Sequence, residues 1–235
     1  MAAPSWTASP HRPLETLADG LWRLDAEMSS PPFQRHMTIA RLSTGELVVH
    51  SAVTGDEPTM AHIDSLGRVA YIVVPSGFHR MDAPRYAARY PQAKVVAPRA
   101  AGERVRQVVR LDGGLELLPT DAALRWEPLE GAAGEAVLLH TDTRGALTAI
   151  FNDAFFNLPH MAGWRGLVNR TTRSAGGPRV TPIARMVLVK DKPAFAAHLR
   201  RLAALPGLAR IVPGHGEVIA TDPAAALEQA AAGLA

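Results

Sequence analysis

Hydrophobic residues occur in short runs along the chain, and the clearest runs alternate with a helical pattern. The run VAYIVVP at residues 69–75 is almost entirely apolar, as expected of a strand that is covered on both faces. Residues 83–90 have a helical pattern that ends before Pro91, and KVVA at residues 94–97 forms a second buried run. These segments predict a βαβ unit with parallel strands and a right-handed crossover.

Further strand and helix patterns surround this unit. The other strand-like segments are residues 20–25, 37–42, 46–52, 114–118, 124–128, 136–140, 146–151 and 209–212. Helical patterns lie at residues 58–66, 193–205 and 222–234. Ser43-Thr44-Gly45 predicts a hairpin turn. The order of elements predicts two mixed sheets with helices outside. We expect a loose tail at residues 1–13 and one domain at residues 14–235, whose two halves share one core.

Composition supports a globular protein and excludes several kinds of site. Of the 235 residues, 47% are hydrophobic and 20% are charged, which is typical of a chain that buries a substantial core. The absence of Cys rules out disulfides, iron–sulfur clusters, thiolate zinc sites and cysteine nucleophiles. The N-terminal sequence lacks a secretory-signal pattern, and no apolar run approaches the ~18 residues of a membrane span. We therefore expect a cytoplasmic protein with no membrane partner.

One stretch, residues 154–190, is basic and contains no acidic residue. Its cations are Arg165, Arg170, Arg173, Arg179, Arg185 and Lys190. One hypothesis is an anion-binding lid in which Arg165, Arg170 and Arg173 clamp a carboxylate or phosphate. The alternative is a solvated loop. Because strong aromatic interleaving is missing, we expect a small anionic ligand and no nucleic acid. The sequence does not predict an oligomeric state.

Acid–base side chains follow the predicted buried strands, at the ends where an open α/β sheet presents residues to a ligand. They are His50, His79, Asp82, His140, Asp153 and His215. His215 lies in the turn Pro213-Gly214-His215-Gly216, which follows a short apolar strand. This repeated placement indicates a shared polar site. The alternative is a buried hydrogen-bond network without a ligand.

The order of these residues resembles the metallo-β-lactamase superfamily, most specifically in the segment IVPGHGEVI. The resemblance extends from about residue 15 to residue 230 and implies an αββα sandwich. In that superfamily a His-x-His-x-Asp-His loop is followed by a lone His, an Asp and a final His. Most members are hydrolases that use one or two zinc, iron or manganese ions. This chain looks like a divergent branch, because Gly77 and Met81 replace the first His and the Asp of the loop.

The resemblance implies a role for each remaining residue. His79 matches the second His of the loop, and Asp82 stands in place of its last His. His140, Asp153 and His215 match the lone His, the bridging Asp and the final His, while His50 stands where a supporting Asp is usual. A first metal position would use His79, His140 and Asp153. A second would use Asp82, Asp153 and His215.

Because Asp153 is common to both sets, the implied ligands support at most one well-held divalent metal, and a metal-free protein is also compatible. Asp82 has an alternative role as the N-cap of the helix at residues 83–90. Two functions remain open. One is a metal-dependent hydrolase of esters, thioesters or phosphoesters with Asp153 as a catalytic residue, and the other is a non-catalytic protein that binds a ligand or partner.

Overall fold

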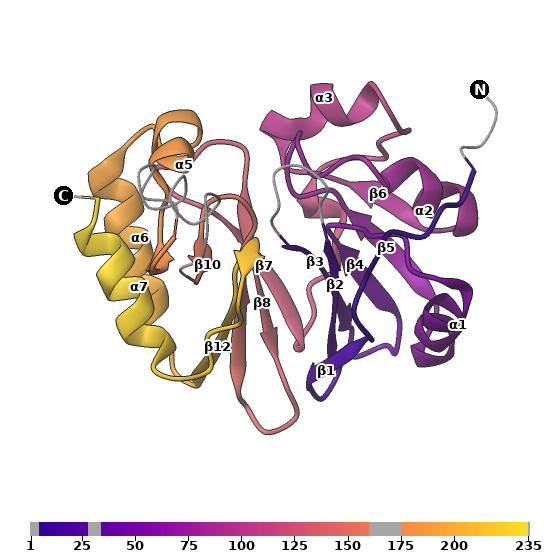
Figure 1. Cartoon of the computed structure of the whole chain (residues 1–235), viewed down its shortest axis with the longest axis horizontal. Coiled ribbons are helices and arrows are strands. Elements are labelled where there is room, and N and C mark those ends of the chain that lie inside the picture. Colours follow the sequence, from indigo (N-terminus) through magenta and orange to yellow (C-terminus); the bar gives the residue numbers. More distant parts are fainter. Residues whose placement is uncertain (1–4, 28–33, 160–174, 235) are drawn as a thin grey trace. The chain divides into compact units, whose positions relative to one another are not determined.

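The computed structural model describes residues 5–27, 34–159 and 175–234, coloured along the chain in Figure 1. The chain divides into two compact units, each with its own hydrophobic cluster. Unit 1 comprises Met1–Trp126 and His140–Thr143, and unit 2 comprises Glu127–Leu139 and Arg144–Ala235. The expected single domain at residues 14–235 stays a prediction, and each unit is described by itself. No helix in the described ranges is long and apolar enough to cross a membrane.

Unit 1 is built on a six-stranded sheet with the strand order β1-β2-β3-β4-β5-β6. The strands are β1 (Glu15–Ala18), β2 (Leu21–Glu27), β3 (Gln34–Arg41), β4 (Leu47–His50), β5 (Val69–Val73) and β6 (Lys94–Val96). The first four strands pair antiparallel, while β4, β5 and β6 run parallel. The predicted hairpin and βαβ unit are thus confirmed.

The helices of unit 1 pack on one face of this sheet through a shared apolar cluster. They are α1 (Glu57–Leu66), α2 (Ala83–Arg89), the short η1 (Arg99–Ala101) and α3 (Gly102–Arg106). A further short helix, η2 (Leu115–Leu117), follows them in the chain. The strand predicted at residues 114–118 is wrong, because this segment forms the helical turn η2. Leu117 N donates to Gly114 O at 3.1 Å, which closes the turn locally and leaves no ladder with a neighbouring strand.

The N-terminal segment is not loose where it is described. Residues 5–13 are bound to the rest of unit 1, since Arg12 N donates to Asp25 O at 2.9 Å. The Trp6 ring lies 5.4 Å from the Tyr86 ring, centroid to centroid. The expected tail is therefore wrong for these residues, because the apolar surface of Trp6 is covered by α2.

In its described residues, unit 2 contains two sheets and three helices. A four-stranded sheet has the order β12-β9-β8-β7, and a three-stranded sheet has the order β11-β10-β13. The strands are β7 (Leu124–Pro128), β8 (Ala136–Thr141), β9 (Leu147–Ile150), β10 (Phe156–Leu158), β11 (Gly177–Arg179), β12 (Leu208–Val212) and β13 (His215–Gly216). The division between the units passes through β7 and β8.

The helices of unit 2 are α5 (Pro182–Val187), α6 (Lys192–Ala203) and α7 (Pro223–Ala232). Side chains of α6 and α7 share an apolar cluster with those of β8 and β9, and the two helices lie side by side in Figure 1. Asp191 and Asp222 cap α6 and α7 by accepting backbone N–H groups of Ala194 and Ala225. These caps fix where each helix begins.

Candidate metal centre

Two glycines bring the final histidine of the chain against the segment that follows β9. Gly214 N donates to Phe155 O at 3.0 Å, and β13 then runs parallel to β10 with His215 opposite Phe156. A Cβ atom on Gly214 would lie 2.2 Å from Asn152 O, and one on Gly216 would lie 2.0 Å from Asn157 O. No side chain fits at such distances. The Gly-His-Gly pattern is therefore required by close backbone approach.

Asp153 and His215 meet at this approach. Their Oδ1 and Nε2 atoms are 3.3 Å apart, and both side chains are largely buried. The His215 ring also stacks on Phe156, with ring centroids 4.9 Å apart and planes inclined by 28°. This stacking limits rotation of the imidazole and keeps Nε2 directed toward the carboxylate.

The donor set and spacing of this pair fit a metal ion. Two ligands bound at about 2.0 Å in tetrahedral geometry around zinc lie about 3.3 Å apart. The observed separation of 3.3 Å equals that value. Carboxylate oxygen and imidazole nitrogen both suit zinc, iron and manganese.

A buried glutamate holds the Asp153 turn in place. Glu135 accepts from Asn152 Nδ2 at 3.2 Å, from Asp153 N at 3.1 Å and from Ala154 N at 2.8 Å. Burial raises the pKa of the Glu135 carboxyl well above its usual range, and the nearby Asp153 carboxylate raises it further, although the three donors act in the opposite direction. Glu135 thus fixes the backbone on which Asp153 is presented.

In unit 1, His79 lies in the loop after β5 and is oriented by two serines. Its Nδ1 is hydrogen-bonded to Ser51 Oγ at 2.9 Å. Ser76 Oγ accepts from Phe78 N at 3.2 Å and from His79 N at 3.3 Å, which folds the loop tightly. Ser51 itself has a φ of 58°, a conformation that is uncommon outside glycine.

His50 ends β4 as predicted and is fully enclosed. Burial lowers the pKa of His50 to about 3, and the neighbouring His79 contributes to the same shift. The imidazole is therefore neutral at physiological pH. A neutral histidine beside His79 avoids like-charge repulsion there.

This pKa predicts an acid-sensitive fold. In the unfolded chain His50 binds a proton below about pH 6.5, whereas in the folded chain it does so only near pH 3. The contribution of neutral His50 to the free energy of unfolding is therefore fully present above pH 6.5, and it is lost as the pH falls toward 3. At pH 5 the expected loss is about 2 kcal/mol.

Urea unfolding of the chelator-treated protein at pH 8 and pH 5 tests this prediction. The His50→Gln variant should lose less free energy of unfolding between the two pH values than the wild type. The matched control is His62→Gln, because His62 is exposed on α1. Equal pH dependence in the wild type and the His50→Gln variant would contradict the prediction.

Asp82 stands at the N-cap of α2, but its side chain makes no capping hydrogen bond. Instead its carboxylate pairs with Arg35 of β3, and its Oδ1 lies 3.1 Å from Arg85 Nη1. The N-cap interpretation is therefore wrong for the side chain, because two guanidinium groups compete for both oxygens. The role of Asp82 as a metal ligand stays a prediction.

Gly77, at the first position of the motif, and His140, the lone histidine, have identifiable neighbours within unit 1. A Cβ atom on Gly77 would lie 2.6 Å from Arg104 Cδ, so the stem of Arg104 fills the space that a histidine would need. The guanidinium of Arg104 lies 4.7 Å over the Phe78 ring. His140 is buried at the end of β8, and a Cβ atom on Gly20 would lie 3.4 Å from its Nε2.

The structure therefore brings Asp153 and His215 together in unit 2, and His79 and His50 together in unit 1. Sequence reasoning missed Glu135, Ser51 and Phe156, which contact Asp153, His79 and His215. It also missed Arg35, which pairs with the Asp82 carboxylate. Glu135 offers one signal, a single acidic residue at the start of the apolar run AVLL. The predicted anion clamp of Arg165, Arg170 and Arg173 lies outside the described residues.

No family model and no curated protein matches the chain. Its structure resembles DIM-1 metallo-β-lactamase exposed to ceftazidime, with a TM-score of 0.65 and 10% identity over 97% of this chain and 100% of that one. A metallo-β-lactamase from Erythrobacter litoralis with β-mercaptoethanol in the active site gives a TM-score of 0.62 and 14% identity, over 94% and 96% of the two chains. A metallo-β-lactamase from Pontibacter korlensis gives 0.61 and 13%, over 94% and 99%. The predicted fold is confirmed, and this chain has the metallo-β-lactamase fold.

Proposed function

We propose that this protein is a hydrolase that holds one divalent metal through His79, Asp153 and His215. The observation that carries the proposal is the Asp153–His215 pair, whose 3.3 Å separation equals the spacing of two ligands on one metal. Glycine-dependent backbone contacts and the Glu135 hydrogen bonds hold this pair before any ligand binds. Such preorganisation is a requirement of a catalytic metal site.

His79 is the third ligand in this proposal, because it occupies the second histidine position of the motif. Its Nδ1 contact with Ser51 is the kind of outer interaction that orients a metal-binding imidazole and sets its tautomer. Three protein ligands leave one position open, which is the arrangement of a catalytic rather than a structural zinc site.

A bound divalent ion would supply Lewis acidity, which makes water nucleophilic near neutral pH and polarises an acyl or phosphoryl oxygen. The residues of the chain then have separate tasks. Asp153 provides a carboxylate that can accept a proton from the attacking water. His215, held by Phe156, keeps its imidazole aligned with that carboxylate. Esters, thioesters and phosphoesters are the substrates that this chemistry covers.

Metal content is the direct test. The protein should be purified without a histidine tag or chelator, and its zinc, iron and manganese measured by plasma mass spectrometry. We expect about one equivalent per chain, as a three-ligand site requires. Hydrolysis of p-nitrophenyl esters, a thioester and a phosphodiester should disappear on chelation and return when the same metal is restored. The His62→Ala variant, which removes an exposed histidine, should keep both metal and activity.

The second candidate function is metal-free ligand binding on the same fold. Two observations favour it: Arg104 fills the space beside Gly77, and arginines engage both oxygens of Asp82. Under this alternative the protein contains less than about a tenth of an equivalent of metal, even after incubation with each ion. That outcome would rule out the hydrolase proposal.

A further inference from the structure

The loop that carries His79 exposes large apolar side chains to solvent. Phe78, directly before His79, is 53% exposed, and Met81, two positions after it, is 63% exposed. The other aromatic side chains in the described ranges are buried or half-buried. An apolar side chain left in water forgoes the free energy that burial would provide. Two such side chains next to a proposed metal ligand therefore indicate a surface that a ligand covers.

The loop is attached to α3 through one residue, Arg104. A Cβ atom on Gly77 would lie 3.1 Å from Arg104 Cβ, so the stem of Arg104 packs directly on the loop backbone. Arg80 donates to Arg104 O, and its Nη1 also donates to Gln107 Oε1 at 2.7 Å. Phe78 lies between Gly77 and Arg80 in the chain. Contacts on both sides of Phe78 therefore hold this part of the loop against α3.

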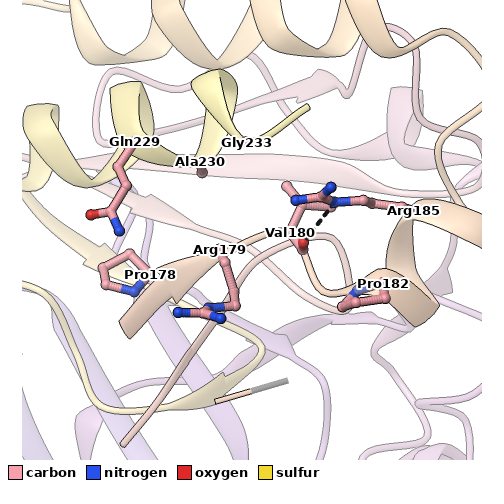
Figure 2. A pocket seen from close by; sticks show the side chains of 8 residues that line it. All are labelled: Pro178, Arg179, Val180, Pro182, Arg185, Gln229, Ala230 and Gly233. Atoms are coloured by element: carbon pink, nitrogen blue, oxygen red, sulfur yellow. Dashed lines mark hydrogen bonds between the residues drawn. The ribbon is translucent and has the colours of Figure 1, made fainter. Parts of the chain in front are cut away.

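The guanidinium of Arg104 differs from other arginine groups of the protein in what it contacts. The Arg89 guanidinium pairs with two carboxylates of α1. Arg185, which lines a pocket of unit 2, donates from Nε to Val180 O at 3.1 Å, as Figure 2 shows. The Arg104 guanidinium instead lies 4.7 Å over the Phe78 ring. An aromatic ring orients a cation without neutralising its charge.

No carboxylate pairs with Arg104 in the part of the chain that the structure describes. The residues outside this part, 1–4, 28–33, 160–174 and 235, include no Asp or Glu. Glu103 precedes Arg104 on α3, but adjacent positions of a helix do not face each other. Phe78 and Arg104 thus combine an exposed ring with an exposed cation that has no acidic partner.

We propose that Phe78 and Arg104 form a subsite for an aromatic anion, and that the substrate is an ester or thioester that carries such a group. The aromatic part packs against the exposed surface of Phe78, and its carboxylate or phosphate accepts hydrogen bonds from the Arg104 guanidinium. Because Phe78 adjoins His79 in the chain, a ligand held there lies beside the proposed metal position. The assignment to a substrate rests on the proposed hydrolase function, whereas binding of the aromatic anion requires no metal.

Binding is tested on the metal-free protein with chelator present, so that the result does not depend on the hydrolase proposal. The probes are 2-naphthoate and 2-naphthyl phosphate. Uncharged 2-naphthamide and acetate serve as partial ligands, and nuclear magnetic resonance titration follows each of them. We expect at least one naphthyl anion to bind about fivefold or more tightly than either partial ligand, since a ring contact and a charge-assisted hydrogen bond each contribute about that factor.

Two single variants locate the site. Arg104→Gln should lower the affinity for the naphthyl anion to that for 2-naphthamide, and Phe78→Ala should weaken binding about fivefold. Arg104→Gln keeps the backbone oxygen that Arg80 contacts, so the loop stays attached to α3. The matched controls are Arg106→Gln, an exposed cation of the same helix, and Leu117→Ala, an exposed apolar residue of unit 1. Both controls should keep the affinity within about twofold, because solvent screens charges that do not touch the ligand.

Binding of only one naphthyl anion supports the subsite and shows whether it takes a carboxylate or a phosphate. Absence of binding by both anions would overturn the inference. Equal affinity for the anions and for 2-naphthamide would also overturn it, as would equal weakening by Arg104→Gln and Arg106→Gln.

Hydrolysis by the metal-loaded protein then connects the subsite to the reaction. The kcat/KM for 6-acetoxy-2-naphthoate should exceed that for 2-naphthyl acetate about fivefold, and Arg104→Gln should remove this preference while Arg106→Gln keeps it. Hydrolysis of both esters without preference would overturn the inference and leave the hydrolase proposal standing. Conversely, Arg104-dependent binding of naphthoate by a protein that takes up no metal would support the subsite and contradict the hydrolase proposal.

Discussion

Replacement of Asp153 by Asn is expected to remove the metal and abolish hydrolysis while leaving the fold intact. The substitution keeps the shape of the side chain but replaces a charged oxygen ligand with a neutral amide. Loss of an outer-shell partner already costs 10- to 100-fold in metal affinity, so loss of a direct ligand should cost at least about 100-fold. The Asp153 backbone remains hydrogen-bonded to Glu135, which preserves the local turn.

Equilibrium metal titration and steady-state hydrolysis measure the two effects. The matched control is Glu217→Gln, which removes the same charge from an exposed residue two positions beyond His215. The control should retain metal affinity within a few-fold, because exposed charges are screened by solvent. An Asp153→Asn protein that keeps its metal and its activity would show that the carboxylate is not a ligand.

Replacement of Gly216 by Ala is expected to be strongly destabilising and to displace His215. Gly216 has a φ of 96°, and an added Cβ atom would lie 2.0 Å from Asn157 O. That oxygen belongs to the backbone and cannot move aside cheaply. β13 must therefore separate from β10, which breaks the pairing that places His215 opposite Phe156.

Gly145→Ala is the matched control for this experiment. Gly145 has a φ of 80°, so alanine there has a similar backbone strain, but nothing lies within 4 Å of the added Cβ atom. Urea unfolding should show that Gly216→Ala loses about 1–3 kcal/mol more than Gly145→Ala, which is the usual cost of overpacking. Metal affinity should fall only in the Gly216→Ala variant. Equal losses in the two variants would mean that the close approach to Asn157 is unimportant.

The larger elements of the fold were predictable because their patterns are long enough to be periodic. The apolar runs that form β5 and β6, with the helix between them, identify the parallel part of unit 1 from the sequence. The three-stranded sheet of unit 2 was not predicted. Its strands have only two or three residues, which is too short for alternation to be visible.

The candidate site was predictable in its residue types but not in its contacts. Asp153 and His215 were identified because both follow buried strands, and the structure places them together. The side-chain N-cap role of Asp82 was predicted wrongly because its partner Arg35 is 47 positions away, and pairing across that separation leaves no local pattern. Side-chain competition of this kind is decided by tertiary packing, which neither spacing nor propensity describes.

The shortness of the strands in the β11-β10-β13 sheet has a consequence for motion. A sheet held by so few backbone hydrogen bonds opens by local fluctuation at a much lower free energy than the apolar cluster beneath α6 and α7. Amide hydrogens of β10 and β13 should then exchange with solvent through sub-global openings that leave the four-stranded sheet closed. In each such opening His215 moves away from Asp153. The free energy of this local opening therefore sets the fraction of molecules in which the two side chains are in contact.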